Sequence, residues 1–269
     1  MPAKLPGQVT IEENVVFGSG GGRDLTCDVF TPPDEATDRP ALLILHGGAW
    51  RNGDKSQLKY YGIQLARYGY LCVCSEYRLS GESTWPAQVH DAKAAVRWMR
   101  GNAGTLGIDA ERIAVTGNSA GGHLALMLAA TPDTPGLEGD GGHEDASSRC
   151  AAAIAIYPPT SLTGVTEEES AVGELFGGEA SDEVVEAASP VTYAHRSFPP
   201  TMLVHGNADE VVPVASSFAM YDALSDCGAA VEMHIFDRQP HAFDTEVDFA
   251  RQIADLSALF LGRVLTAAA

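Results

Sequence analysis

The chain has 269 residues, and its 17 Lys and Arg against 36 Asp and Glu give a formal net charge of −19 at pH 7. A composition that is 45% hydrophobic and 20% charged excludes an intrinsically disordered protein, because disordered chains lack the apolar residues of a core. An acidic surface repels phosphate groups, so we expect neither nucleic acid nor membrane as a partner. The sequence leaves the oligomeric state open.

The first seven residues contain no apolar stretch of the signal-peptide kind, and the longest apolar runs, such as 41–45 and 151–156, are too short to cross a membrane. The cysteines number 5, an odd count, and form no C-x-x-C pair. This pattern favours reduced thiols over disulfides or a zinc site. The sequence therefore predicts a cytoplasmic protein.

The first two predicted strands, 9–17 and 25–31, flank a glycine-rich cluster at 18–22. We expect an antiparallel hairpin with a long glycine-rich turn. The cluster does not predict phosphate binding, because neither a helix nor a Gly-Lys-Ser/Thr ending follows it.

After the hairpin, apolar runs of strand length alternate with segments of helical period. This alternation is typical of a parallel sheet with helices on both faces, so we predict an α/β fold with a mostly parallel, eight-stranded sheet in one domain over residues 1–269. The remaining strands are predicted as buried runs at 41–45, 70–75, 112–116, 151–157, 201–205 and 231–236. Helices are predicted at 57–68, 86–102, 120–130, 214–227 and 243–264, and the second of these is amphipathic.

Two long segments interrupt the alternation. Residues 133–148 are rich in Gly and acidic residues but lack the alternating oxygen ligands of a calcium loop, so we expect a solvated loop. Residues 158–200 have no predicted strand, carry the acidic run Glu167-Glu168-Glu169, and include a short helical piece at 182–188. An insertion of this length is more often functional than a plain connector, and we expect a small flap there.

The sequence Gly117-Asn118-Ser119-Ala120-Gly121 matches G-x-S-x-G. The match alone is a weak signal, but a predicted strand precedes it and an apolar helical stretch follows it. This is the strand, sharp turn and helix of a nucleophile elbow, in which the glycines let the serine adopt a strained conformation with an exposed hydroxyl. Ser119 is therefore the candidate nucleophile.

A second motif, His46-Gly47-Gly48-Ala49-Trp50, directly follows the predicted strand 41–45. Consecutive glycines after a strand let backbone N–H groups turn inward together, and such donors bind the negative oxygen of a tetrahedral intermediate. We therefore expect this loop to form part of an oxyanion hole. Trp50 is equally consistent with a wall of an acyl pocket and with plain packing.

A serine nucleophile needs an adjacent base, and the chain has 8 histidines. His241 stands out because it lies between the last predicted strand and the last predicted helix. His205 and His234 fall inside predicted strands, where core positions are expected. Asp209, in the loop after the strand 201–205, is the candidate acid, and the chain order Ser, Asp, His is that of the α/β-hydrolase topology. Its competitors are Glu210, Asp237 and Asp244.

In combination, the motifs resemble those of the α/β-hydrolases of the esterase/lipase superfamily, close to the feruloyl-esterase-like carboxylesterases and related to hormone-sensitive-lipase-like esterases and kynurenine formamidases. The chain differs from the common pattern at Ala49, where many relatives have a third glycine, and at Asn118, where Asp, Glu or His is common. The motifs that carry the resemblance lie at 46–50, 77–80, 86–91, 117–125, 188–190, 205–213 and 241–243.

The resemblance implies an α/β-hydrolase fold and a serine carboxylesterase that cleaves short-chain or small neutral esters through an acyl-enzyme. Ser119 would attack, His241 would act as base, and Asp209 would orient the imidazole. The oxyanion hole would consist of the backbone N–H groups of Gly48, Ala49 and Ala120, with Gly47 as the alternative to Ala49. A neutral histidine base predicts a rate that rises with pH until the imidazole is deprotonated.

No metal and no cofactor are expected, because the predicted triad itself supplies nucleophile and base. The expected partner is a small-molecule ester. Two alternatives within the enzyme class are an arylformamidase of the kynurenine formamidase kind and a sugar or xylan acetyl esterase, since the same triad cleaves formamides and acetyl esters. A ligand-binding receptor of the same fold is an alternative from another class, and it is disfavoured because such receptors typically lack a working base.

Overall fold

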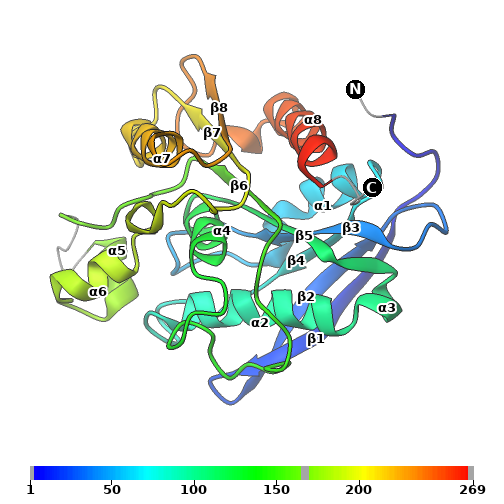
Figure 1. Ribbon diagram of the computed structural model, residues 1–269, viewed down its shortest axis with the longest axis horizontal. Helices are drawn as coiled ribbons and strands as arrows, with labels where there is room; N and C mark the ends of the chain where they lie inside the picture. Colours follow the sequence, from blue (N-terminus) through cyan, green and yellow to red (C-terminus); the bar gives the residue numbers. More distant parts are fainter. Residues whose placement is uncertain (1–2, 165–169, 266–269) are drawn as a thin grey trace.

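An eight-stranded sheet runs through the computed structural model, which describes residues 3–164 and 170–265 (Figure 1). The strand order is β1-β2-β4-β3-β5-β6-β7-β8. In this order β2 is antiparallel to both of its neighbours, β1 and β4, and all pairs from β4 to β8 are parallel, which confirms the predicted fold class. The strands are β1 (Thr10–Gly20), β2 (Arg23–Thr31), β3 (Arg39–Leu45), β4 (Leu71–Ser75), β5 (Ile108–Asn118), β6 (Ala152–Ile156), β7 (Thr201–Gly206) and β8 (Val231–Phe236).

Helices cover both faces of this sheet (Figure 1). One face packs against α1 (Lys59–Ala66) and α8 (Val247–Val264), and the other packs against α2 (Ala87–Gly101), α4 (Ala120–Ala130) and α7 (Ala215–Asp226). The central strands are apolar throughout because both of their faces are covered. In β3, for example, the neighbours Leu42 and Leu43 are both fully buried, on opposite faces of the sheet. A short helix, α3 (Ala103–Leu106), follows α2.

The N-terminal hairpin has a shorter turn than the sequence predicts. Gly18, Ser19 and Gly20 belong to β1 and pair with Leu25, Asp24 and Arg23, so that only Gly21 and Gly22 form the turn. Both turn glycines have positive φ, 59° and 83°, the conformation that a two-residue hairpin turn requires. The prediction of a long turn was wrong because three residues of the glycine-rich cluster, 18–20, pair with β2 as part of the strand.

The C-terminal part of the chain differs from the prediction in two ways. The single helix expected at 243–264 is a 3₁₀ turn, η3 (Phe243–Thr245), followed by α8, and the two are separated by Glu246 in extended conformation (φ −78°, ψ 122°). The strand β8 lies at the sheet edge, so it is only partly buried, and His234 is half-buried beside Glu232 rather than in a core.

The polar side of α2 is buried, although the sequence predicts an ordinary amphipathic helix and a solvated loop at 133–148. Lys93 and Arg97 are 0% and 2% exposed, and both bind Glu138 of that loop. Asp91 of the same helix is held by a bidentate bond from Arg78. The acidic loop therefore covers the cationic face of the helix.

The insertion at 158–200 contains two short helices, α5 (Ala171–Phe176) and α6 (Asp182–Ala187), and the 3₁₀ turn η2 (Pro190–Tyr193). In Figure 1, α5 and α6 lie at one side of the molecule, away from β1 and β2. The acidic run Glu167-Glu168-Glu169 lies outside the described residues. Over the described ranges, no helix is long and apolar enough to span a membrane.

Candidate active site

Ser119 lies at the sharp turn between β5 and α4. Its backbone is strained (φ 52°, ψ −120°), as in a nucleophile elbow. The flanking glycines are needed for close packing: a Cβ on Gly117 would lie 2.4 Å from the Gly121 carbonyl, and a Cβ on Gly121 would lie 2.0 Å from the oxygen of Leu45. The close backbone packing that exposes the hydroxyl of Ser119 therefore requires glycine at both flanking positions.

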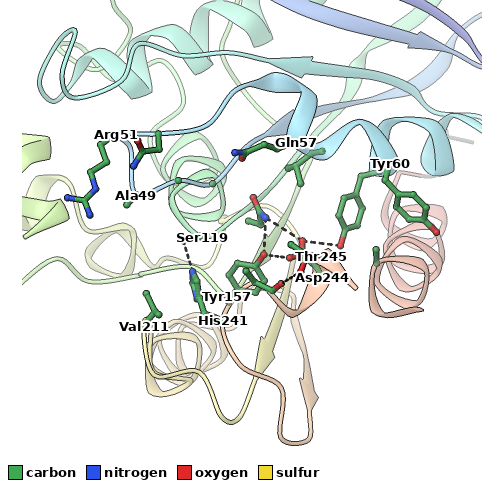
Figure 2. Close-up of a pocket in the computed structure, with 18 of the residues that line it drawn as sticks. Ala49, Arg51, Gln57, Tyr60, Ser119, Tyr157, Val211, His241, Asp244 and Thr245 are labelled. Atoms are coloured by element: carbon green, nitrogen blue, oxygen red, sulfur yellow. Dashed lines mark hydrogen bonds between the residues drawn. The ribbon is translucent and has the colours of Figure 1, made fainter. Parts of the chain in front are cut away.

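The structure brings the three predicted residues of the triad together. His241 Nε2 lies 3.0 Å from the hydroxyl oxygen of Ser119 (Figure 2). His241 Nδ1 lies 2.7 Å from Asp209 Oδ2. The other oxygen of Asp209 accepts the backbone N–H groups of Val211 and Val212, each at 2.9 Å. A hydrogen-bonded chain of this kind can withdraw the serine proton and stabilise the resulting imidazolium.

The three competing acids lie elsewhere. Glu210 is exposed, and Asp237 is an exposed partner of Arg238. Asp244 is buried, but it binds Tyr157 and Tyr61 rather than His241. His205 is buried as expected: its Nδ1 lies 2.7 Å from the hydroxyl of Ser217, its Nε2 donates to the carbonyl of Val212 at 2.8 Å, and burial lowers its pKa.

The loop after β3 approaches Ser119 with a strained backbone. Gly48, Ala49 and Trp50 all have positive φ, and a Cβ on Gly48 would lie 2.0 Å from the Asn52 carbonyl oxygen. In the described part of the chain, the backbone N–H groups of Gly48, Ala49 and Ala120 donate to no other group. The same holds for Gly47, so both alternatives for this donor stay open. These free donors border the space around Ser119.

Two cavities meet at Ser119, and both are lined by Ala49, Ser119 and Val211. The larger has a volume of about 730 Å³ and contains His241 in its wall. The smaller has a volume of about 240 Å³ and a mostly apolar wall, to which the insertion contributes Leu162 and Val172. The larger cavity is also lined by polar groups of Asn52, Gln57, Asn118, Tyr157, Asp244 and Thr245.

A cluster of buried polar groups forms one wall of the larger cavity (Figure 2). The Tyr157 hydroxyl donates to Asp244 Oδ1 and accepts from Asn118 Nδ2 at 2.8 Å. The Tyr157 ring also contacts the His241 ring, with centroids 4.6 Å apart. Burial raises the pKa of the Tyr157 hydroxyl well above its ordinary value, and the nearby Asp244 carboxylate adds to this effect. Tyr157 is not among the residues predicted for the site, and its one signal in the sequence is its place at a strand end.

An ion pair links the mouth of the larger cavity to the insertion. Arg51, which lines the cavity, lies 2.7 Å from Glu174 of α5, and both side chains are about two-fifths exposed. Exposed pairs of this kind contribute only about 0–1 kcal/mol. Within residues 3–164 and 170–265, no group of three or more His, Cys, Asp and Glu side chains is arranged to hold a metal ion.

Comparison with known proteins shows the family to which the chain belongs. The BD-FAE family model matches residues 27–224. Esterase LipQ of Mycobacterium tuberculosis is 34% identical over 254 residues, which cover 90% of this chain and 60% of LipQ. The chain spans only 54–62% of the length of the first three curated relatives it matches.

Two solved structures are similar over almost the whole chain. The apo form of Thermogutta terrifontis esterase 2 has a TM-score of 0.82 and 30% identity, and the match covers 100% of this chain and 99% of that one. A bifunctional GH43-CE protein of Bacteroides eggerthii has a TM-score of 0.85 and 26% identity, over 95% of this chain and 35% of that one. The chain therefore belongs to the BD-FAE family of α/β-hydrolase esterases.

Proposed function

We propose that this protein is a serine carboxylesterase that hydrolyses short-chain or small neutral carboxylic esters through an acyl-enzyme. The observation that carries the proposal is the hydrogen-bonded chain from Ser119 through His241 to Asp209, with links of 3.0 Å and 2.7 Å. The names of the related esterases support the same reaction class.

In the proposed reaction, His241 Nε2 takes the proton of Ser119 as the serine oxygen attacks the ester carbonyl. Asp209 holds the imidazole in the tautomer that has its proton on Nδ1 and stabilises the imidazolium. The N–H groups of Gly48, Ala49 and Ala120 bind the negative oxygen of the tetrahedral intermediate. The intermediate collapses when His241 gives its proton to the leaving alcohol, and a water molecule then repeats the sequence on the acyl-enzyme.

The position of His241 supports the placement of one half of the ester in each cavity. The leaving alcohol must lie beside the imidazole that protonates it, and His241 lines only the larger cavity. The acyl group then occupies the smaller cavity, between Leu162, Val172 and Pro213. A volume of about 240 Å³ supports a preference for short acyl chains.

The polar wall of the larger cavity supports a second candidate within the same chemistry, an acetyl esterase acting on sugar esters. Side chains such as Asn52, Gln57 and Thr245 offer hydrogen bonds to a hydroxylated alcohol. The structural relative from Bacteroides eggerthii is a bifunctional GH43-CE protein, which agrees with this candidate.

The test is turnover of p-nitrophenyl acetate, butyrate and octanoate by the wild type and by Ser119→Ala. We expect acetate and butyrate to be cleaved faster than octanoate, and the variant to lose about 10⁴-fold or more in kcat. Equal rates for the two proteins would contradict the nucleophile assignment. Adding an acetylated sugar and an N-formyl anilide to the panel separates the sugar esterase and the arylformamidase from a general carboxylesterase, and absence of all turnover would favour a receptor.

A further inference from the structure

The larger cavity, where the proposed reaction places the leaving alcohol, contains a buried carboxyl group with no role in that reaction. Asp244 is 6% exposed and lines the larger cavity. It receives hydrogen bonds from the Tyr157 hydroxyl, from the Tyr61 hydroxyl at 3.3 Å and from Asn118 Nδ2 at 3.4 Å. Asn118 directly precedes Ser119, so this carboxylate lies close to the reacting centre.

The hydrogen bonds around Asp244 favour its charged form. All three neighbours can donate to its oxygens, and such donors stabilise a carboxylate. Burial nevertheless raises the pKa of Asp244 above its ordinary value, against the lowering effect of these bonds. Among the described residues, no cation forms an ion pair with Asp244. As a carboxylate, Asp244 is compensated only by neutral donors.

Two oxygen atoms in the wall of this cavity can accept further hydrogen bonds. The two bonds to Asp244 Oδ2 are long, at 3.3 Å and 3.4 Å, so that oxygen can still accept a stronger bond. The adjacent amide oxygen, Asn118 Oδ1, is buried and has no hydrogen-bond partner within the described ranges. Unsatisfied buried acceptors are rare in proteins, and a donor supplied by a ligand is one explanation for such a group.

We propose that Asp244 is a specificity-determining residue that selects esters whose leaving alcohol carries a hydrogen-bond donor, a hydroxyl or a protonated amine. This inference rests on the proposed esterase function and on the placement of the alcohol beside His241. A donor on the alcohol would bind the carboxylate of Asp244, whereas an apolar alcohol of the same shape would leave that charge buried against carbon.

Two pairs of acetate esters of matched shape test the proposal. 2-Hydroxyethyl acetate is compared with propyl acetate, and 2-(dimethylamino)ethyl acetate, protonated at neutral pH, is compared with 3-methylbutyl acetate. We expect the wild type to favour a donor ester over its apolar partner by about tenfold in kcat/KM, and Asp244→Asn to bring that ratio close to 1. The pair that shows the preference identifies the source of the donor as a neutral hydroxyl or a cationic amine.

Within each variant, the ratio of kcat/KM for a donor ester to kcat/KM for its apolar partner does not depend on the fraction of active enzyme. The result for a partly folded variant can therefore still be interpreted. Asp248→Asn is the matched control, because this exposed residue of α8 pairs with Arg251 and lines neither cavity, and its ratios should equal those of the wild type. Should Asp244→Asn fail to fold, Tyr61→Phe removes one competing donor and should maintain or increase the preference.

Ratios near 1 in the wild type, or unchanged ratios in Asp244→Asn, would overturn the role of Asp244 while leaving the esterase proposal intact. A decreased preference in Tyr61→Phe would also count against it. If the wild type cleaves none of the four acetates, nor p-nitrophenyl acetate, the esterase proposal itself fails.

Discussion

The indole N–H of Trp50 donates a hydrogen bond to Nδ1 of His123 across 3.2 Å, and so connects the loop after β3 to helix α4. The other ring nitrogen, His123 Nε2, lies 2.7 Å from the carbonyl oxygen of Ala188 and donates to it, which fixes the tautomer. His123 is fully buried, and burial lowers its pKa to about 4, so the ring is a neutral acceptor at ordinary pH. The bond therefore holds Trp50, and with it Ala49, in its strained conformation.

Trp50→Phe removes the donor and keeps most of the ring. We expect kcat to decrease about tenfold while KM changes by less than about twofold, because a misplaced oxyanion donor weakens binding of the transition state rather than of the substrate. Steady-state kinetics with p-nitrophenyl acetate measure both constants. Trp98→Phe, a similar change on α2 at a residue that lines neither cavity, should leave both unaltered, and an equal loss in the two variants would indicate a general packing effect.

The depressed pKa of His123 makes the free energy of unfolding depend on pH. In unfolded chains a histidine binds a proton below about pH 6.5, whereas folded His123 stays neutral down to about pH 4. Between these values the unfolded state binds more protons, so stability decreases as pH is lowered from 6.5 to 4, by about 3 kcal/mol from this group. Urea unfolding across this range measures the slope, and His123→Gln should reduce it.

Asp209→Asn should decrease kcat about 10³–10⁴-fold with little change in KM, because an amide in place of the carboxylate favours the wrong imidazole tautomer and cannot stabilise the imidazolium. Glu210→Gln is the matched control, since it neutralises the next carboxyl along the chain, which is exposed. A larger decrease in Glu210→Gln than in Asp209→Asn would reverse the assignment of the acid.

Gly121→Ala should destabilise the fold by about 3 kcal/mol or more, because its Cβ would lie 2.0 Å from a backbone oxygen that cannot move aside. Gly104→Ala in α3 has no atom within 4 Å of the added Cβ, so it should be neutral or slightly stabilising. Urea denaturation of both variants compares them directly, and similar midpoints would show that the elbow has more space than the structure indicates.

Chelators should leave the rate of ester hydrolysis unchanged, because Ser119, His241 and the backbone donors supply the nucleophile, the base and the oxyanion site. Incubation with EDTA followed by dialysis and assay tests this expectation. A loss of rate that added divalent metal restores would require a revised mechanism.

Much of this architecture could be predicted from local patterns. The parallel strands are continuous apolar runs because both faces of the sheet are covered, and Ser119 lies in a turn whose glycines are dictated by contacts with Leu45 and Gly121. Local patterns failed where distant segments decide the outcome. The sequence predicts only an amphipathic helix around Lys93 and Arg97, yet both side chains are buried because Glu138, more than 40 residues further on, binds both.

The polar cluster of the larger cavity could not be predicted from the sequence for the same reason. Asp244 is a candidate acid by sequence, and nothing local indicates that it binds Tyr157, Tyr61 and Asn118, which come from three other parts of the chain. The sequence does not predict the break before α8, because residues 243–246 have the spacing of a helix. In the structure, Phe243 packs against Phe236 and Phe249 and begins a separate 3₁₀ turn.

The pairing of Leu45 with Gly117 in adjacent parallel strands has a consequence for how such an enzyme can diversify. The loop after β3 and the serine turn leave the sheet at the same level and touch through backbone atoms, so neither can shift without the other. Other parts of the cavity walls come from stretches outside these two elements, among them 57–61, 159–162 and 244–250. New substrate preferences can therefore accumulate in those stretches by ordinary side-chain replacement, while the reacting atoms keep their positions.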